Sequence, residues 1–150
     1  MVPQCPDQLV FVGDYIDRGE HSAEVLFRLQ ALSQSTGAIC LMGNHEQMML
    51  DFLENPAKNG PRWRRYGGLQ TLASFGQGHI AEAAPDETWQ AARDDLRRAM
   101  GPELEFWIRS LPVYWRSGNM AVVHAGADPQ VRLSEQERRS LLWGHPDFPK

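Results

Sequence analysis

Three short polar clusters contain the residue types that could perform chemistry in this chain. Residues 13–19 read Gly-Asp-Tyr-Ile-Asp-Arg-Gly, residues 43–46 read Gly-Asn-His-Glu, and residues 124–126 read His-Ala-Gly. Carboxylate and amide oxygens and imidazole nitrogens are ligands that suit Mn, Fe or Zn. Glycines beside these ligands let the backbone turn sharply and approach an ion closely. The clusters therefore predict a site for a first-row metal ion.

Each cluster also has a structural interpretation. Residues 13–19 could form a turn with a local ion pair, residues 44–46 could be a helix cap with a charged first turn, and His124 could be a structural histidine. A zinc-protease helix is excluded, because Met49 occupies the position of the second histidine in that motif. Turn chemistry alone does not explain why all three clusters follow apolar runs, so we favour the site.

The segments around the first two clusters predict an α/β unit. Apolar runs at residues 9–12 and 38–42 are typical of buried strands, and each ends at a polar cluster. Helices are predicted over residues 22–33, with Ser22 as the N-cap, and over residues 46–53. Alternating strands and helices indicate parallel strands. In such sheets functional residues gather at the carboxyl ends of the strands, where both clusters lie.

The rest of the chain is predicted to be helical apart from one hairpin and a turn at residues 59–61. The hairpin strands, residues 113–116 and 120–124, flank a Ser-Gly-Asn turn, and the second strand ends at the third cluster. The further predicted helices, the last one opened by a capping box of Ser134 and Glu137, cover residues 69–75, 86–100, 102–110 and 134–143. We also expect Trp107, Trp115 and Trp143 to be core or sheet-packing residues and not a binding platform.

Composition excludes several classes of protein. The chain has 150 residues and a net charge of -4, which suits one globular domain and argues against binding to nucleic acid or an anionic membrane. Residues 62–66, Arg-Trp-Arg-Arg-Tyr, are therefore interpreted as a surface loop near a phosphate-binding cleft. No run approaches the roughly 20 apolar residues of a membrane span, and residues 1–7 do not resemble a secretory signal. Cys5 and Cys40 are expected to be reduced thiols of a cytoplasmic protein, although their geometry decides whether they pair.

The order and spacing of the three motifs resemble a known family. Gly-Asp-x-x-Asp-Arg-Gly, Gly-Asn-His-Glu and His-Ala-Gly form the central motif series of the phosphoprotein phosphatases, a branch of the calcineurin-like metallophosphoesterases, and the bacterial members look most similar. The resemblance covers about residues 8–148, and softer matches include Gly67-Gly68 followed by Thr71-Leu72. It implies an α/β fold with a layered sheet and flanking helices.

The resemblance assigns metal ligands and catalytic residues to positions in this chain. Asp14 would bridge two ions, and Asn44 and His124 would ligate the second ion. Manganese is the metal expected from the resemblance, with iron or zinc as alternatives.

The same resemblance implies roles for three further side chains and a second one for Asn44. Arg18 would clamp the phosphoryl oxygens, with Asn44 beside it in substrate binding. His45 would protonate the leaving oxygen, and Asp17 would orient the imidazole.

Two motifs of the family are absent from the chain. A Gly-Asp-x-His-Gly motif would lie upstream of Leu9, and a Gly-His motif would lie beyond Lys150. We therefore expect residues 1–150 to be a single partial domain, truncated at both ends, that holds at most one ion well and is poorly active or inactive. His145 follows a glycine, but its position after Leu-Leu-Trp favours a loop residue.

The predicted function is metal-dependent hydrolysis of phosphomonoesters by metal-activated hydroxide, as in serine/threonine protein phosphatases. The full Asp17-Arg18-Gly19 sequence and Glu46 favour that branch. The expected partners are phosphorylated proteins or small phosphoesters, with neither nucleic acid nor membrane. Two alternatives stay open: a dinucleoside polyphosphate hydrolase on the same fold, and a non-catalytic remnant that binds phosphate or a partner.

Overall fold

The first two predicted strands form a parallel pair. The computed structural model describes residues 7–148. In it β1 (Val10–Phe11) pairs with β2 (Ile39–Cys40), and the N–H of Leu41 donates to the carbonyl of Phe11 at 2.8 Å. Both strands are shorter than the apolar runs, because the chain leaves the ladder just before each polar cluster. The parallel arrangement confirms that the two clusters emerge from the same end of a strand pair.

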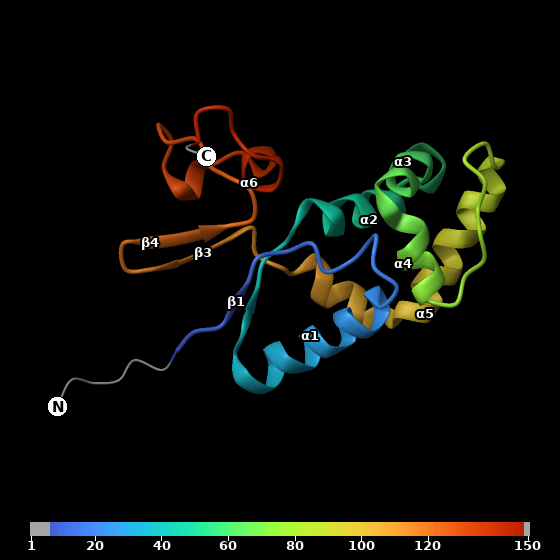
Figure 1. Cartoon of the computed structure of the whole chain (residues 1–150), viewed down its shortest axis with the longest axis horizontal. Coiled ribbons are helices and arrows are strands. Elements are labelled where there is room, and N and C mark those ends of the chain that lie inside the picture. The colour runs from blue at the N-terminus through green and yellow to red at the C-terminus, as the bar shows by residue number, and fades with distance from the viewer. Residues whose placement is uncertain (1–6, 149–150) are drawn as a thin grey trace.

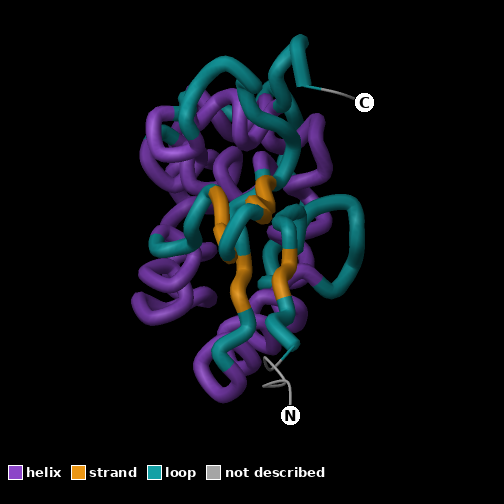
Figure 2. The backbone as a smooth tube through the Cα atoms, turned by 90° about the vertical axis from the view of Figure 1, so that its left-hand side faces the viewer, coloured by secondary structure: helices purple, strands orange, loops and turns teal. Residues whose placement is uncertain are grey.

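The predicted hairpin is also present. β3 (Tyr114–Ser117) and β4 (Met120–Val123) pair antiparallel, with Ser117 opposite Met120. The α/β class is confirmed, and the strands of the described residues form two separate two-stranded sheets. The strands are short, and helices and loops make up most of the described backbone (Figure 2).

The two helices around the first clusters differ from prediction at their N-termini. α1 (Ser22–Thr36) begins after His21, so Ser22 as N-cap was wrong. Ser22 lies inside the helix because its hydroxyl accepts a hydrogen bond from the N–H of Asp17 at 3.2 Å. α2 (Asn44–Glu54) begins two residues earlier than predicted and includes the polar cluster in its first turn.

The middle of the chain is more helical than its sequence suggests. α3 (Pro56–Trp63) continues into a π-helical turn, η1 (Arg64–Gly68), and then into α4 (Leu69–Ser74). The predicted turn at residues 59–61 and the predicted surface loop at residues 62–66 were therefore wrong. Gly60 is tolerated inside α3 because the indole of Trp89 packs where its side chain would be.

The C-terminal third confirms the predicted helices in part. α5 (Asp86–Arg109) spans both predicted helices, and its backbone leaves the helical region at Gly101, where φ is 73°. The predicted capping box was wrong, because Ser134 lies in a short 3-10 helix, η2 (Leu133–Glu135), and α6 (Arg138–Trp143) begins only after Glu137. Because of this short 3-10 helix, Ser134 and Glu137 do not lie together in the first turn of one helix.

The core lies among α1, α2, α3 and α5 (Figure 1). Its centre is aromatic: the ring of Phe52 lies 4.9 Å from that of Trp63 and 6.3 Å from that of Trp89, measured between centroids. Cys40 is buried in this core, which raises the pKa of its thiol, and Cys5 lies outside the described residues. Trp143 is 39% exposed, so its assignment to the core was wrong.

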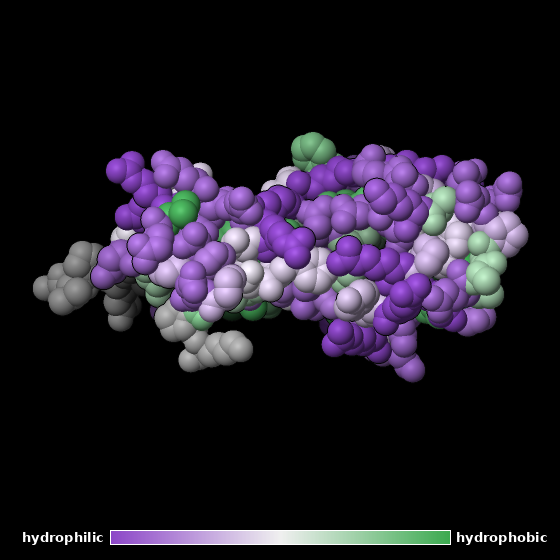
Figure 3. Space-filling model, turned by 90° about the horizontal axis from the view of Figure 1, so that it is seen from above, coloured by the Kyte–Doolittle hydropathy of each residue, from purple (hydrophilic) through white to green (hydrophobic). Residues whose placement is uncertain are grey.

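The face shown in Figure 3 is mostly hydrophilic, with apolar side chains scattered over it. None of the helices within residues 7–148 combines the length and apolarity that crossing a membrane requires.

The second half of α5 offers a matched test of the core. Leu104 is 1% exposed, whereas Phe106, two residues along the same helix, is 74% exposed. Leu104→Ala should lower the free energy of unfolding by about 2–5 kcal/mol, because it removes buried methyl groups and leaves a cavity. Phe106→Ala should change it by less than about 0.5 kcal/mol. Urea denaturation of both variants checks this, and equal losses would contradict the assigned core.

Candidate functional site

The three polar clusters meet where β1, β2 and β4 end. The backbones of Gly13 and Gly43 are in direct contact: a Cβ atom on Gly13 would lie 2.5 Å from the Cα of Gly43 and 2.8 Å from Nδ1 of His124. Gly13 also has φ of 98°, a conformation that L side chains rarely adopt. Only glycine fits this position, and its absence of a side chain lets all three clusters converge.

Asp14 and His124 face each other at this junction. Oδ1 of Asp14 lies 3.4 Å from Nε2 of His124. The other ring nitrogen, Nδ1, lies 2.6 Å from the carbonyl oxygen of Val12, which can only accept a hydrogen bond. Nδ1 therefore carries the proton in the neutral ring, and Nε2 is left with its lone pair beside the carboxylate. This is the tautomer that a metal ligand needs.

Asn44, the first residue of α2, supplies a further oxygen. Its Oδ1 atom is buried and accepts no hydrogen bond from the described residues. A buried acceptor without a partner is unfavourable, so it calls for a ligand such as a cation. No three His, Cys, Asp or Glu side chains within residues 7–148 are grouped to hold an ion. The candidate donors are one carboxylate, one imidazole and one amide, which are ligand types that suit a first-row divalent ion.

Glu46 connects the loop after β1 to the start of α2 through hydrogen bonds. Its side chain is fully buried, and its two carboxylate oxygens accept the N–H groups of Asp14 and Gly43, both at 2.9 Å, and of Tyr15 at 2.7 Å. Burial raises the pKa of Glu46, and these three hydrogen bonds oppose that shift. One side chain thus fixes both the loop after β1 and the start of α2.

His45 and Asp17 form a second pair next to the ligand set. Nδ1 of His45 lies 2.6 Å from Oδ2 of Asp17, and both residues are 7% exposed. The hydrogen bond to Asp17 raises the pKa of His45, and burial and the charge of Arg18 partly oppose it. The imidazole is therefore oriented through Nδ1, with Nε2 left for other chemistry.

Two residues that complete this pair were not predicted as site residues, although Thr71 belongs to one of the softer family matches. Trp63 donates its indole N–H to Asp17 at 2.9 Å, and the hydroxyl of Thr71 donates to the same carboxylate at 2.6 Å. A signal for Trp63 existed, because Pro56, Gly60 and Trp63 recur at helical spacing and form the buried face of α3. Interpreting residues 62–66 as a loop obscured that pattern.

Arg18 lies at the edge of the site. Its backbone N–H donates to the carbonyl of Gly67 at 3.4 Å, and its side chain is exposed. Asp14, Asp17 and Arg18 all have positive φ, at 59°, 71° and 60°. Three such non-glycine residues in one loop indicate backbone strain held in place by the surrounding hydrogen bonds.

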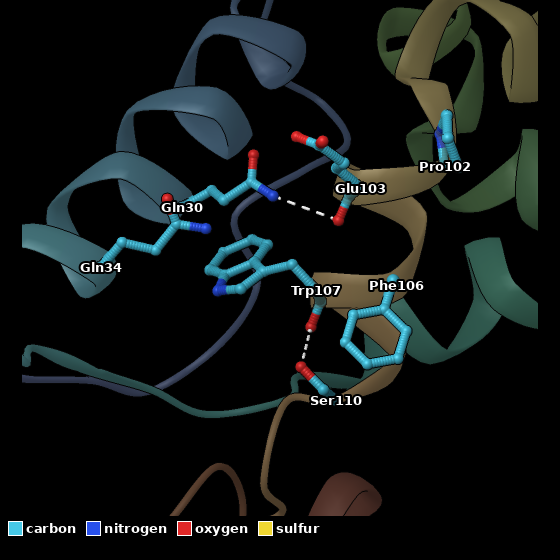
Figure 4. Close-up of a pocket in the computed structure, with 7 residues that line it drawn as sticks. All are labelled: Gln30, Gln34, Pro102, Glu103, Phe106, Trp107 and Ser110. Atoms are coloured by element: carbon cyan, nitrogen blue, oxygen red, sulfur yellow. Dashed lines mark hydrogen bonds between the residues drawn. The ribbon is translucent and has the colours of Figure 1, made fainter.

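Two hollows lie apart from these residues. A groove of about 420 Å³ between α1 and the second half of α5 is lined by Gln30, Phe106 and Trp107, among others, and by none of the predicted site residues (Figure 4). A second hollow lies beside His145, whose Nε2 atom is 3.7 Å from Oδ2 of Asp128. His145 follows the end of α6, which confirms it as a loop residue.

Comparison with known proteins gives one family match and several relatives. The model of the calcineurin-like phosphoesterase family matches residues 2–145. The chain is 30% identical to the asymmetrical bis(5'-nucleosyl)-tetraphosphatase PrpE of Bacillus velezensis, over 93% of the chain and 53% of that protein. It is 29% and 31% identical to symmetrical bis(5'-nucleosyl)-tetraphosphatases of Nitrosococcus oceani and Aromatoleum aromaticum.

These alignments cover only part of each relative. For the two symmetrical enzymes they include 87% and 86% of the chain but 37% and 39% of the relative. The chain therefore spans about half, or less, of the length of the curated relatives it matches. No solved structure shows a significant match.

Thr71 gives a matched test of the buried carboxylate. Thr71→Val should lower the free energy of unfolding by about 1–3 kcal/mol, because it removes the hydroxyl that donates to the carboxylate of Asp17 and accepts its backbone N–H. Thr71→Ser keeps the hydroxyl and should cost only about 1 kcal/mol for the lost methyl group. Urea denaturation measures both, and a serine variant as unstable as the valine variant would refute the hydrogen-bond explanation.

The pair of His45 and Asp17 predicts a pH dependence of stability. The folded-state pKa of His45 lies above its ordinary value of 6.5, so the pair stabilises the fold fully below about pH 6.5. That contribution is lost as pH rises through the folded-state pKa. The difference in unfolding free energy between the wild type and His45→Asn should therefore shrink as pH rises.

Urea denaturation from roughly pH 6 to roughly pH 9, with divalent ions chelated, measures that difference. A difference that stays constant or widens over this range would show that the pair does not raise the pKa of His45.

Proposed function

Because this chain belongs to the calcineurin-like phosphoesterase family, we propose that its strand-end site hydrolyses phosphoesters with a bound divalent ion. The observation that carries the proposal is the junction of Asp14, Asn44 and His124, with a buried His45–Asp17 pair beside it. Metal ligands next to an oriented imidazole form the combination that displacement at phosphorus needs.

Asp14, Asn44 and His124 would hold the ion. The carboxylate of Asp14 supplies negative charge, His124 supplies Nε2, and the unpartnered oxygen of Asn44 supplies a neutral ligand. When bound, the ion supplies Lewis acidity, which makes an attacking water more acidic and offsets charge on the phosphoryl group. We propose manganese, with iron or zinc as alternatives, since this donor set accepts all three.

His45 is proposed as the general acid that protonates the leaving oxygen. Its hydrogen bond to Asp17 fixes the ring and raises its pKa, which favours the protonated form before the reaction. Trp63 and Thr71 hold the carboxylate of Asp17 in turn, so the imidazole has little freedom to rotate.

Arg18 is proposed to bind the phosphoryl oxygens. Its exposed guanidinium, carried on a strained loop whose backbone is tied to Gly67, offers two parallel donors to a phosphate. Asn44, the first residue of α2, is proposed to add its side-chain N–H group to phosphate binding. Together they would offset the charge that builds on the equatorial oxygens.

Two substrate classes have support. The relatives are named as bis(5'-nucleosyl)-tetraphosphatases, which favours dinucleoside tetraphosphates. The sequence Asp17-Arg18-Gly19 and Glu46 favours phosphomonoesters, including those of phosphoproteins, through the resemblance to protein phosphatases. We propose the dinucleoside polyphosphates first, because whole-chain similarity carries more information than two short motifs. A cytoplasmic location stays a prediction.

Hydrolysis assays test the proposal directly. The chain with added Mn²⁺ should release phosphate or nucleotide from diadenosine tetraphosphate faster than from p-nitrophenyl phosphate or a phosphopeptide. Asp14→Asn should remove the Mn²⁺-dependent rate, and His45→Asn should lower turnover by roughly 10²- to 10⁴-fold, because it removes the general acid.

The exposed Phe106→Leu variant, on the far side of the core, serves as a control and should match the wild type. A phosphopeptide preferred over the dinucleotide would favour the phosphatase. No turnover above the Asp14→Asn variant with any substrate would refute the proposal that this chain is a hydrolase.

A further inference from the structure

One arginine and two aromatic rings form an exposed group at the surface, which we call the stacking cluster: Arg62, Tyr66 and Trp143. The guanidinium carbon of Arg62 lies 5.3 Å from the ring centroid of Trp143 and 6.0 Å from that of Tyr66. Tyr66 is 41% exposed and Trp143 is 39% exposed. Both rings are thus partly open to water while they lie against one cation, so each has exposed surface on which another ring can stack.

The Tyr66 side of the cluster is attached to the proposed phosphate-binding loop. Tyr66 precedes Gly67, whose carbonyl accepts the backbone N–H of Arg18 at 3.4 Å. A Cβ atom on Gly67 would lie 2.8 Å from Cγ of Arg18, so the two segments of the chain are in contact. Tyr66 is therefore one residue away from the segment that contacts Arg18.

The Trp143 side is attached to the other edge of the site. The carbonyl of Leu141 in α6 accepts the N–H of Ala125 at 2.9 Å, and Ala125 directly follows His124. Arg138 at the start of α6 donates to the side chain of Gln47 at 2.8 Å, two residues after His45. The cluster thus joins two segments, and each of them contacts a residue of the proposed site or its immediate neighbour.

The charge of Arg62 is not compensated within residues 7–148. Its neighbours Arg64 and Arg65 both form ion pairs with Glu82, but no described carboxylate lies within ion-pair distance of Arg62. The N–H groups of its guanidinium likewise find no partner among the described residues. A free guanidinium between two rings favours a planar, electron-rich partner that carries negative charge nearby.

We propose that the stacking cluster binds the base of a nucleotide whose phosphate occupies the site of Asp14, Arg18 and His124. The proposal rests on the proposed function, since it assigns the base-binding part of that same site. Base stacking on aromatic rings and arginine tolerates different bases, because every base has a π-face. A phosphopeptide would not require two open rings, so the cluster favours the nucleotide class of substrate.

Three probes separate base binding from phosphate binding. The 5'-methylenephosphonate analogue of AMP carries both groups and resists hydrolysis, methylphosphonate carries no base, and adenosine carries no phosphate. Their affinities for the full chain are measured by titration calorimetry with Mn²⁺, in the wild type and in Tyr66→Leu and Trp143→Leu. Phe106→Leu controls for loss of an exposed aromatic elsewhere, and Trp143→Phe tests rescue by another ring.

The AMP analogue should bind the wild type more tightly than methylphosphonate does, by roughly 5- to 100-fold. Both leucine variants should lose most of this advantage without weakening methylphosphonate, whereas Trp143→Phe and Phe106→Leu should keep it. Equal affinities for the analogue and methylphosphonate in the wild type would overturn the proposal and leave the phosphate site standing. A third outcome is that adenosine binds, that the leucine variants weaken this binding, and that methylphosphonate does not bind. That result would support the cluster and refute the phosphate site. Binding of none of the three probes would overturn both.

Discussion

The carboxylate of Glu46 is the constraint on which the geometry of the site depends. A fully buried carboxylate is costly, and here it is stabilised by the N–H groups of Asp14, Tyr15 and Gly43. Those three groups belong to two loops that are about thirty residues apart in sequence, so the carboxylate determines where each loop lies relative to the other. The positive φ of Asp14 is maintained by the same hydrogen bond. The relative placement of the proposed metal ligands is thus a consequence of satisfying one buried charge.

A second buried carboxylate connects the site to the helical part of the molecule. Asp17 receives hydrogen bonds from His45 in α2, Trp63 in α3 and Thr71 in α4. Trp63 packs against Phe52 at the centre of the core, so the orientation of His45 is coupled to core packing through one shared carboxylate. The helices after α2 therefore contribute to the site as well as to stability, although none of their residues is a proposed metal ligand.

The sequence predicted the parts of the site that are local. Asp14, Asn44 and His124 each lie one or two residues after an apolar run, and a strand that ends in a polar cluster can be recognised within a few residues. Thr71 and Trp63 reach Asp17 across 54 and 46 positions, and no local period encodes such a contact. The turn at residues 59–61 was wrong for the same reason, because the packing of Trp89 against Gly60 decides that the segment is helical. Serine is a common N-cap residue, but neither Ser22 nor Ser134 caps a helix here. Ser22 accepts a hydrogen bond from Asp17, and Ser134 lies in a short 3-10 helix.

The contact between Gly13 and Gly43 limits how this chain can change over evolutionary time. Each glycine excludes a side chain at its own position because the backbone of the other loop fills the space, so replacing one does not make room for replacing the other. Neighbouring core positions can exchange volume in compensating pairs, but two backbones in contact have no volume to exchange. A side chain at either position would therefore push the two loops apart. Functional divergence must instead proceed through the side chains at the rim.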